Sequence, residues 1–117
     1  MGLDTTHNAW HGPYSSFAKW RIWLASKIGL DLDTMVGFGG DVEWSDTLKA
    51  HPLYPLLNHS DCDGELSPSE CKLIAEGLGV IIRDHSDESD KHFIGWCLEF
   101  RGVAILAASE NAAIEFH

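Results

Sequence analysis

The chain has 117 residues, 44% of them hydrophobic, and a formal net charge of −10 at pH 7. This length fits one domain (1–117) built around a single hydrophobic core. The negative charge repels nucleic-acid phosphates and anionic membrane surfaces, which disfavours direct binding to either. Cations and a basic protein are the expected partners, and the sequence leaves the oligomeric state open.

Cysteine usage indicates a reducing compartment, and the hydropathy of the sequence indicates neither a membrane segment nor a secretory leader. The three cysteines are odd in number and form no CxxC pair, which argues against a disulfide framework. The sequence has no apolar run of about 18 residues and no basic-then-apolar leader. We therefore expect a soluble cytoplasmic protein.

The negative charge is unevenly distributed along the chain. Up to Gly40 three acids balance three bases, whereas the remainder has fifteen acids and five bases. Internal complementarity and solubility explain this most simply. The alternative is an acidic face that imitates DNA or binds a basic host protein, as a phage-type inhibitor would.

The first predicted helix covers residues 14–28, with Pro13 suited to its first position and Gly29 placed to end it. Apolar residues recur at helical spacing, which predicts one buried stripe. Lysine and arginine are expected to occupy the other positions of this helix. The stripe comprises Phe17, Trp20, Leu24 and Ile28, and the basic positions are Lys19, Arg21 and Lys27.

Residues 30–55 show little periodicity. The segment MVGFGGDVEW contains three glycines and is compatible with a strand pair, a loop or a helix tail followed by a turn. We expect irregular structure here. Ser45 and Asp46 predict the start of a short helix reaching Ala50, and Pro52 and Pro55 then prevent a long regular helix.

The second main helix is predicted over residues 68–83. Ser67 and Glu70 form a capping box around Pro68, a residue type favoured at the first helical position. Gly77 and Gly79 weaken the helix by about 1 kcal/mol each relative to alanine, so packing must compensate. The expected buried face comprises Cys71, Ile74, Leu78 and either Ile81 or Ile82.

The third main helix is predicted over residues 91–109, although Gly95 and Gly102 leave a hairpin as the alternative. Alanine content and length favour a buried helix. The fold class is therefore mainly α: a single small domain of about three main helices, an EF-hand-like loop and an irregular Gly-rich segment. One face of this helix is Phe93, Cys97, Phe100, Ala104 and Ala107, and a neighbouring face is Ile94, Leu98 and Ile105.

The stretch HSDCDGELSPSE, residues 59–70, fits the pattern of a calcium-binding EF-hand loop. Such a loop takes ligands from positions 1, 3, 5, 7, 9 and 12 and needs glycine at position 6 for a sharp turn. Gly64 sets the register and places Leu66 at position 8 as an apolar anchor. The ligand positions then fall on His59, Asp61, Asp63, the Glu65 carbonyl, Ser67 and Glu70.

Three features weaken the calcium hypothesis, the first being that Pro52 and Pro55 disrupt the helix that usually enters an EF-hand loop. His59 offers a nitrogen where the pattern has a carboxylate, which lowers the expected affinity or favours Mn²⁺ or Zn²⁺ over Ca²⁺. A Glu70 carboxylate bonded to the Ser67 amide in a capping box is not free to chelate. The alternative without metal is an Asx-type turn at Asp61–Gly64 that leads into a capped helix.

Histidines, aromatic rings and a guanidinium gather near the start of the chain. The two histidines lie four residues apart, but Gly12 and Pro13 indicate that the helix begins after them, which weakens a metal pair. A pocket for a planar or anionic, nucleotide-like molecule is the functional hypothesis. A packed N-terminal arm is the structural alternative. The cluster comprises His7, Trp10, His11, Tyr14, Trp20 and Arg21.

Established enzyme motifs are absent from the sequence: it has no nucleophile elbow, phosphate-binding loop, HExxH or Rossmann glycines. Cys62 close to His59 suggests a thiol–imidazole nucleophile, but Asp61 and Asp63 would disfavour the thiolate. We therefore expect no catalytic residue and a non-catalytic binding protein.

Three segments, HNAWHGPYSSFAKWR, PLLNHSDCDGELSPSEC and AIEFH, together resemble a group of small bacterial and bacteriophage proteins without an assigned function. The resemblance implies a prokaryotic, cytoplasmic origin and no particular activity. The middle segment is also similar to EF-hand loops and departs from them at His59. The leading hypothesis is an interaction protein with a divalent-cation loop.

Overall fold

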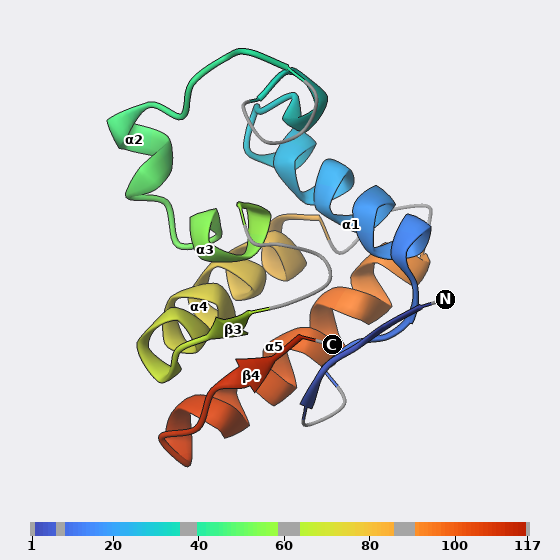
Figure 1. The fold of residues 1–117 in the computed structure, drawn as a ribbon, viewed down its shortest axis with the longest axis vertical. Coiled ribbons are helices and arrows are strands. Elements are labelled where there is room, and N and C mark those ends of the chain that lie inside the picture. Colours follow the sequence, from blue (N-terminus) through green and yellow to red (C-terminus); the bar gives the residue numbers. More distant parts are fainter. Residues whose placement is uncertain (1, 7–8, 36–39, 59–63, 86–90, 117) are drawn as a thin grey trace.

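Three long helices, each matching an apolar periodicity of the sequence, make up most of the fold (Figure 1). The structure is a computed structural model that describes residues 2–6, 9–35, 40–58, 64–85 and 91–116. The long helices are α1 (Tyr14–Lys27), α4 (Pro68–Asp84) and α5 (Lys91–Ser109). The predicted mainly α fold with about three main helices is confirmed. No helix in the described ranges combines the length and apolar character needed to cross a membrane.

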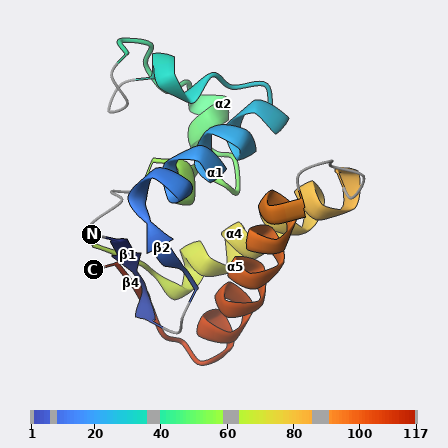
Figure 2. The same ribbon diagram turned by 90° about the vertical axis from the view of Figure 1, so that its right-hand side faces the viewer.

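Helices α4 and α5 lie side by side, and α1 packs against α5 (Figures 1 and 2). The hairpin alternative for residues 91–109 is wrong, because α5 is continuous across Gly95 and Gly102. Helical spacing collects its buried residues into one stripe that a strand would divide between two faces. That stripe is Cys97, Phe100, Ala104 and Ala107.

Helix α1 begins immediately after Pro13 and ends at the predicted glycine. Gly29 has φ +79°, and the Leu30 amide donates to the Ala25 carbonyl at 2.9 Å. The Gly29 amide donates to Ser26 O at 3.2 Å, which completes a Schellman motif. Three members of the predicted stripe, Phe17, Trp20 and Leu24, are fully buried, whereas Ile28 is half-buried against the core just beyond the helix.

Arg21 occupies one of the basic positions beside the predicted stripe, but unlike Lys19 it is buried. Its side chain is only 4% exposed, its Cζ lies 4.8 Å from the centroid of the Phe17 ring, and its Nη1 donates to the backbone carbonyls of Leu56 and Leu57. A guanidinium with bound carbonyl acceptors tolerates this burial better than a bare charge would.

The segment between α1 and α4 is irregular, as predicted. It contains the 3₁₀ helix η2 (Leu32–Thr34) and two four-residue helices, α2 (Asp46–Lys49) and α3 (Tyr54–Leu57). Ser45 caps α2 as predicted, its side chain accepting from the Leu48 amide at 3.2 Å. Residues 36–39 of the Gly-rich stretch lie outside the described residues.

In the part of the chain that the structure describes, four short strands, none of them predicted, bring the two chain ends together (Figure 2). Strand β1 (Gly2–Asp4) pairs antiparallel with β2 (His11–Pro13), and β3 (Glu65–Leu66) pairs antiparallel with β4 (Ile114–Glu115). An isolated bridge between Thr5 and Phe116 connects the two pairs. The C-terminal strand therefore lies next to the segment that precedes α4.

The two glycines of α4 permit close approaches. A Cβ added at Gly77 would lie 2.7 Å from Leu53 Cγ, and one added at Gly79 would lie 3.1 Å from Arg101 Nε. The absence of a side chain at these positions thus makes room for Leu53 and Arg101; that this packing compensates for the low helix propensity stays a prediction. The predicted face of α4 is also confirmed, with Cys71, Ile74, Leu78 and Ile81 buried.

The prediction for α5 is only half right. Its first face packs into the core, but on the neighbouring face Leu98 is 54% exposed and Ile105 is 44% exposed. The helix is therefore not buried on both faces. Spacing shows which residues share a face, whereas the number of neighbouring elements decides whether that face is covered.

Candidate functional site

The EF-hand-like segment is described from Gly64 onward. His59, Asp61 and Asp63, half of the predicted ligand set, lie outside the described residues. Gly64 has φ +88°, a conformation that side chains other than glycine rarely adopt. Its carbonyl accepts a hydrogen bond from the Phe116 amide at 2.9 Å. The bend that the pattern requires at position 6 is therefore present and is attached to the C-terminal strand.

The apolar anchor predicted at position 8 is confirmed. Leu66 is fully buried, and its partner Ile114 across the β3–β4 pair is also fully buried. The Cys71 thiol donates to the Leu66 carbonyl at 3.6 Å, which connects β3 to the first turn of α4. Glu65, whose carbonyl is the predicted position 7 ligand, is exposed between the bend and this anchor.

The end of the loop adopts the capping-box arrangement. The Ser67 amide donates to Glu70 Oε1 at 2.8 Å, and the Glu70 amide donates to Ser67 Oγ at 3.2 Å. Ser67 Oγ also lies 3.1 Å from Ser69 Oγ. Both predicted ligands at positions 9 and 12 are thus bonded to the helix start. A cation would have to replace these bonds.

The chain segment that leads into the loop is held in place by a residue of α1. Arg21 Nη1 donates to the Leu56 and Leu57 carbonyls at 3.4 Å each, so a buried guanidinium binds the last turn of α3 two residues before His59. Sequence reasoning placed Arg21 in a different site and missed this role. The available signal was its position one residue after Trp20 and four after Phe17, next to the buried stripe.

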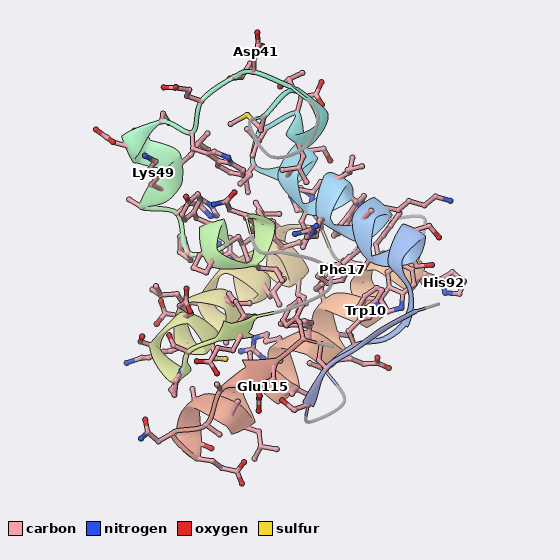
Figure 3. All side chains as sticks on the ribbon, in the orientation of Figure 1. Trp10, Phe17, Asp41, Lys49, His92 and Glu115 are labelled. Atoms are coloured by element: carbon pink, nitrogen blue, oxygen red, sulfur yellow. The ribbon has the colours of Figure 1, made fainter. Side chains whose placement is uncertain are left out.

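The N-terminal cluster is brought together only as part of the core. Trp10 is 5% exposed and stacks on the fully buried Trp20, with ring centroids 5.3 Å apart and planes at 19°. Figure 3 shows Trp10 and Phe17 in the region between α1 and α5. His7 lies outside the described residues, and the side chains of His11 and Tyr14 do as well. The described part of the cluster matches the packed-arm alternative.

The two described cysteines are poor nucleophiles. Burial raises the pKa of Cys97 to about 11, and the hydrogen bond from Trp20 Nε1 at 3.4 Å offsets this only in part. Burial also raises the pKa of Cys71. Both therefore stay as neutral thiols at physiological pH. Cys62 lies outside the described residues.

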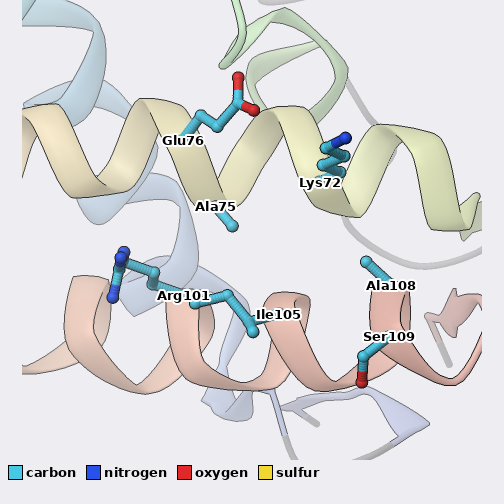
Figure 4. A pocket seen from close by; sticks show the side chains of 7 residues that line it. All are labelled: Lys72, Ala75, Glu76, Arg101, Ile105, Ala108 and Ser109. Atoms are coloured by element: carbon cyan, nitrogen blue, oxygen red, sulfur yellow. The ribbon is translucent and has the colours of Figure 1, made fainter.

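Two of the surface cavities lined by described residues flank α4, and neither was predicted. One, of about 390 Å³, lies in the groove between α4 and α5 (Figure 4). Its polar side chains include Lys72, Glu76 and Arg101, and Ile105 adds apolar surface. The other, of about 340 Å³, is lined in part by His51, whose pKa is lowered by burial and whose Nδ1 accepts from the Leu53 amide at 3.1 Å.

The described acidic side chains are distributed over the surface. Glu70 is half-buried, and the others that the structure describes are exposed. Asp41, for example, projects outward at the top of Figure 3. Within the described ranges no three histidine, cysteine or acidic side chains gather as metal ligands would. A basic partner for the acidic surface stays a prediction.

The comparisons with known proteins add no relative. No protein-family model matches the chain, and no curated protein or solved structure is significantly similar to it.

Proposed function

We propose that the chain is a non-catalytic binding protein in which residues 59–70 bind a divalent cation, with Ca²⁺ as the first candidate and Mn²⁺ or Zn²⁺ as alternatives. The observation that carries the proposal is the register after the bend. Gly64 has a left-handed conformation, Leu66 is a buried anchor, and Glu70 is in the first turn of α4. These are the backbone and packing requirements of positions 6, 8 and 12.

The expected ligands are a mixed set. His59, Asp61, Asp63, the Glu65 carbonyl, Ser67 and Glu70 would supply one nitrogen and several oxygens, including three carboxylates. A bound cation would link the end of α3 to the start of α4. Because the Gly64 carbonyl also accepts from Phe116, the cation would indirectly stabilise the C-terminal strand as well.

The capping box makes the expected affinity low. For Glu70 to chelate, its carboxylate must leave the Ser67 amide, and loss of a capping interaction costs about 1 kcal/mol. The histidine at position 1 also removes one negative ligand from the usual set. These two terms place the expected Ca²⁺ affinity at the weak end of the range for such loops, with dissociation constants of about 10⁻⁴–10⁻³ M.

Calcium should stabilise the folded protein. At a Ca²⁺ concentration ten times the dissociation constant, the free energy of unfolding should rise by about 1.4 kcal/mol, equivalent to a Tm rise of roughly 5 °C. The Asp63→Ala variant should lose this rise. The measurement is thermal unfolding followed by circular dichroism, with NaCl adjusted so that all samples have equal ionic strength.

The matched control is Asp41→Ala, which removes one exposed acid far from the loop and should keep the full Tm rise. Equal ionic strength matters because any added salt screens the repulsion within a chain of net charge −10. An unchanged Tm in Ca²⁺, Mn²⁺ and Zn²⁺ would refute the proposal.

Glu70→Gln separates chelation from capping. Glutamine still accepts from the N-cap amide in a capping box, so the metal-free protein should lose at most about 1 kcal/mol of stability. It lacks the bidentate carboxylate, so most of the Ca²⁺-dependent Tm rise should disappear. A full rise in this variant would show that Glu70 is not a ligand, whatever Asp63→Ala does.

A further inference from the structure

The cavity between α4 and α5 contains a partly buried arginine with an unsatisfied donor. Arg101 is half-buried, and its Nε is buried without a hydrogen-bond partner in the part of the chain that the structure describes. Buried polar groups are usually hydrogen-bonded, and leaving a charged one unsatisfied is unfavourable. The cavity has a volume of about 390 Å³, within the usual range for small-molecule sites. A cation with spare donors at the wall of such a cavity indicates an anionic ligand.

Gly79 determines where the guanidinium lies. A Cβ added at Gly79 would lie 3.1 Å from Arg101 Nε and 3.8 Å from Arg101 Nη2, so the arginine packs against the bare backbone of α4. Glycine is unfavourable inside a helix, and here it admits this one side chain. The Nη groups are not enclosed in the way that Nε is, which leaves them as the donors that a ligand can reach.

Arg101 is the charged side chain that points across the groove. Figure 4 shows it directed from α5 toward α4, whereas Lys72 and Glu76 project from α4 away from α5. Glu76 therefore does not neutralise Arg101, although it lines the same cavity. A groove with one inward cation and an apolar wall matches a ligand that has one negative charge and an apolar body. The apolar wall consists of Ala75, Ile105 and Ala108.

We propose that this cavity binds a small monocarboxylate with an apolar chain, at a second site separate from the cation loop. The carboxylate accepts hydrogen bonds from the guanidinium of Arg101, whose planar geometry it matches. The chain lies along Ile105 and Ala108 and covers part of an isoleucine that is otherwise 44% exposed. One inward cation balances one negative charge, whereas a phosphate dianion would bring a second charge into an apolar groove of a chain with net charge −10.

Octanoate is the probe for this site, and isothermal titration calorimetry of the full chain in EDTA is the measurement. EDTA removes divalent cations, so failure of this proposal and failure of the cation loop are distinguishable. We expect saturable binding of one octanoate per chain. Acetate, which lacks the apolar chain, and octan-1-ol, which lacks the charge, should each bind at least about tenfold more weakly than octanoate.

Arg101→Met should weaken octanoate binding at least about tenfold, because methionine keeps an apolar stem but cannot pair with a carboxylate. The matched control is Arg83→Met, which removes the same charge from an arginine whose side chain is 73% exposed and lies outside the cavity. The control should leave the affinity within about twofold. Ile105→Gln tests the apolar wall at an exposed position and should weaken octanoate binding about fivefold.

Circular dichroism checks that each variant is folded, and Ile105→Gln together with octan-1-ol decides the outcome if Arg101→Met is not. Absence of saturable octanoate binding up to about 10 mM would overturn the proposal. Equal affinities of the Arg101→Met and Arg83→Met variants would also overturn it, as would octan-1-ol binding as tightly as octanoate. Inorganic phosphate that displaces octanoate at equal concentration would overturn the choice of a monocarboxylate with an apolar chain.

Discussion

Replacing Trp20 by alanine is expected to lower the free energy of unfolding by about 3–5 kcal/mol. Trp20 is fully buried and has aromatic neighbours on several sides. Its ring centroid lies 5.3 Å from that of Trp10 and 5.4 Å from that of Phe100. Its Nε1 also donates to Cys97 Sγ at 3.4 Å. The substitution thus removes at once the contacts that Trp20 makes with the N-terminal arm and with α5.

Urea unfolding followed by circular dichroism measures this loss. The matched control is Trp44→Ala, because Trp44 is half-buried beside Tyr54, with ring centroids 5.1 Å apart, and lies at the edge of the core. We expect its loss to be less than half as large. Since small domains are stable by only about 5–15 kcal/mol, Trp20→Ala should leave the fold marginal. Equal losses for the two variants would contradict this assignment of the core.

The long helices were predictable because their signals are local. Apolar spacing, the glycine after α1 and the capping box before α4 each lie within a few residues of the structure they determine. The predicted bounds of 14–28 and 68–83 accordingly differ from Tyr14–Lys27 and Pro68–Asp84 by one residue at one end. Fraying and capping at helix ends account for differences of this size.

The strands were not predictable because their partners are distant in sequence. Glu65–Leu66 pairs with Ile114–Glu115, and Thr5 pairs with Phe116. A two-residue strand has no periodicity to detect, and its stability comes from the partner and the core. The same reason explains why the role of Arg21 was not predicted, since its carbonyl acceptors on α3 are more than thirty residues away in the sequence.

In the candidate site, too, the features that local sequence determines were predictable and those that depend on tertiary contacts were not. Its bend, anchor and capping box follow from the residues of the loop itself, so Gly64, Leu66 and Glu70 have the conformation, burial and position that the pattern predicted. The attachment of the bend to Phe116 and of the loop entry to Arg21 depends on tertiary contacts. These two contacts make the loop part of the fold, so cation binding and global stability should be linked.

Replacing Leu66 by alanine is expected to lower the free energy of unfolding by about 2–5 kcal/mol, the usual cost for a fully buried leucine. The loss should be accompanied by detachment of the C-terminal strand, because β3 consists only of Glu65 and Leu66. Hydrogen exchange should therefore show faster exchange of the Phe116 amide, which donates to Gly64 O. Urea unfolding provides the free energy.

Leu73→Ala is the matched control for Leu66→Ala, since Leu73 is 43% exposed on α4 and should cost about 0.5 kcal/mol or less. The effect of Leu66→Ala on Ca²⁺ binding distinguishes the role of the apolar anchor from that of the cation ligands. Leu66→Ala keeps every predicted cation ligand but frees the segment that positions Glu65, Ser67 and Glu70, so it should weaken Ca²⁺ binding without removing a carboxylate. Leu66→Ala could instead keep both the stability of the unaltered chain and the hydrogen-exchange protection of the Phe116 amide. In that case β3 would not anchor the bend, and the loop register that supports the cation site would be contradicted.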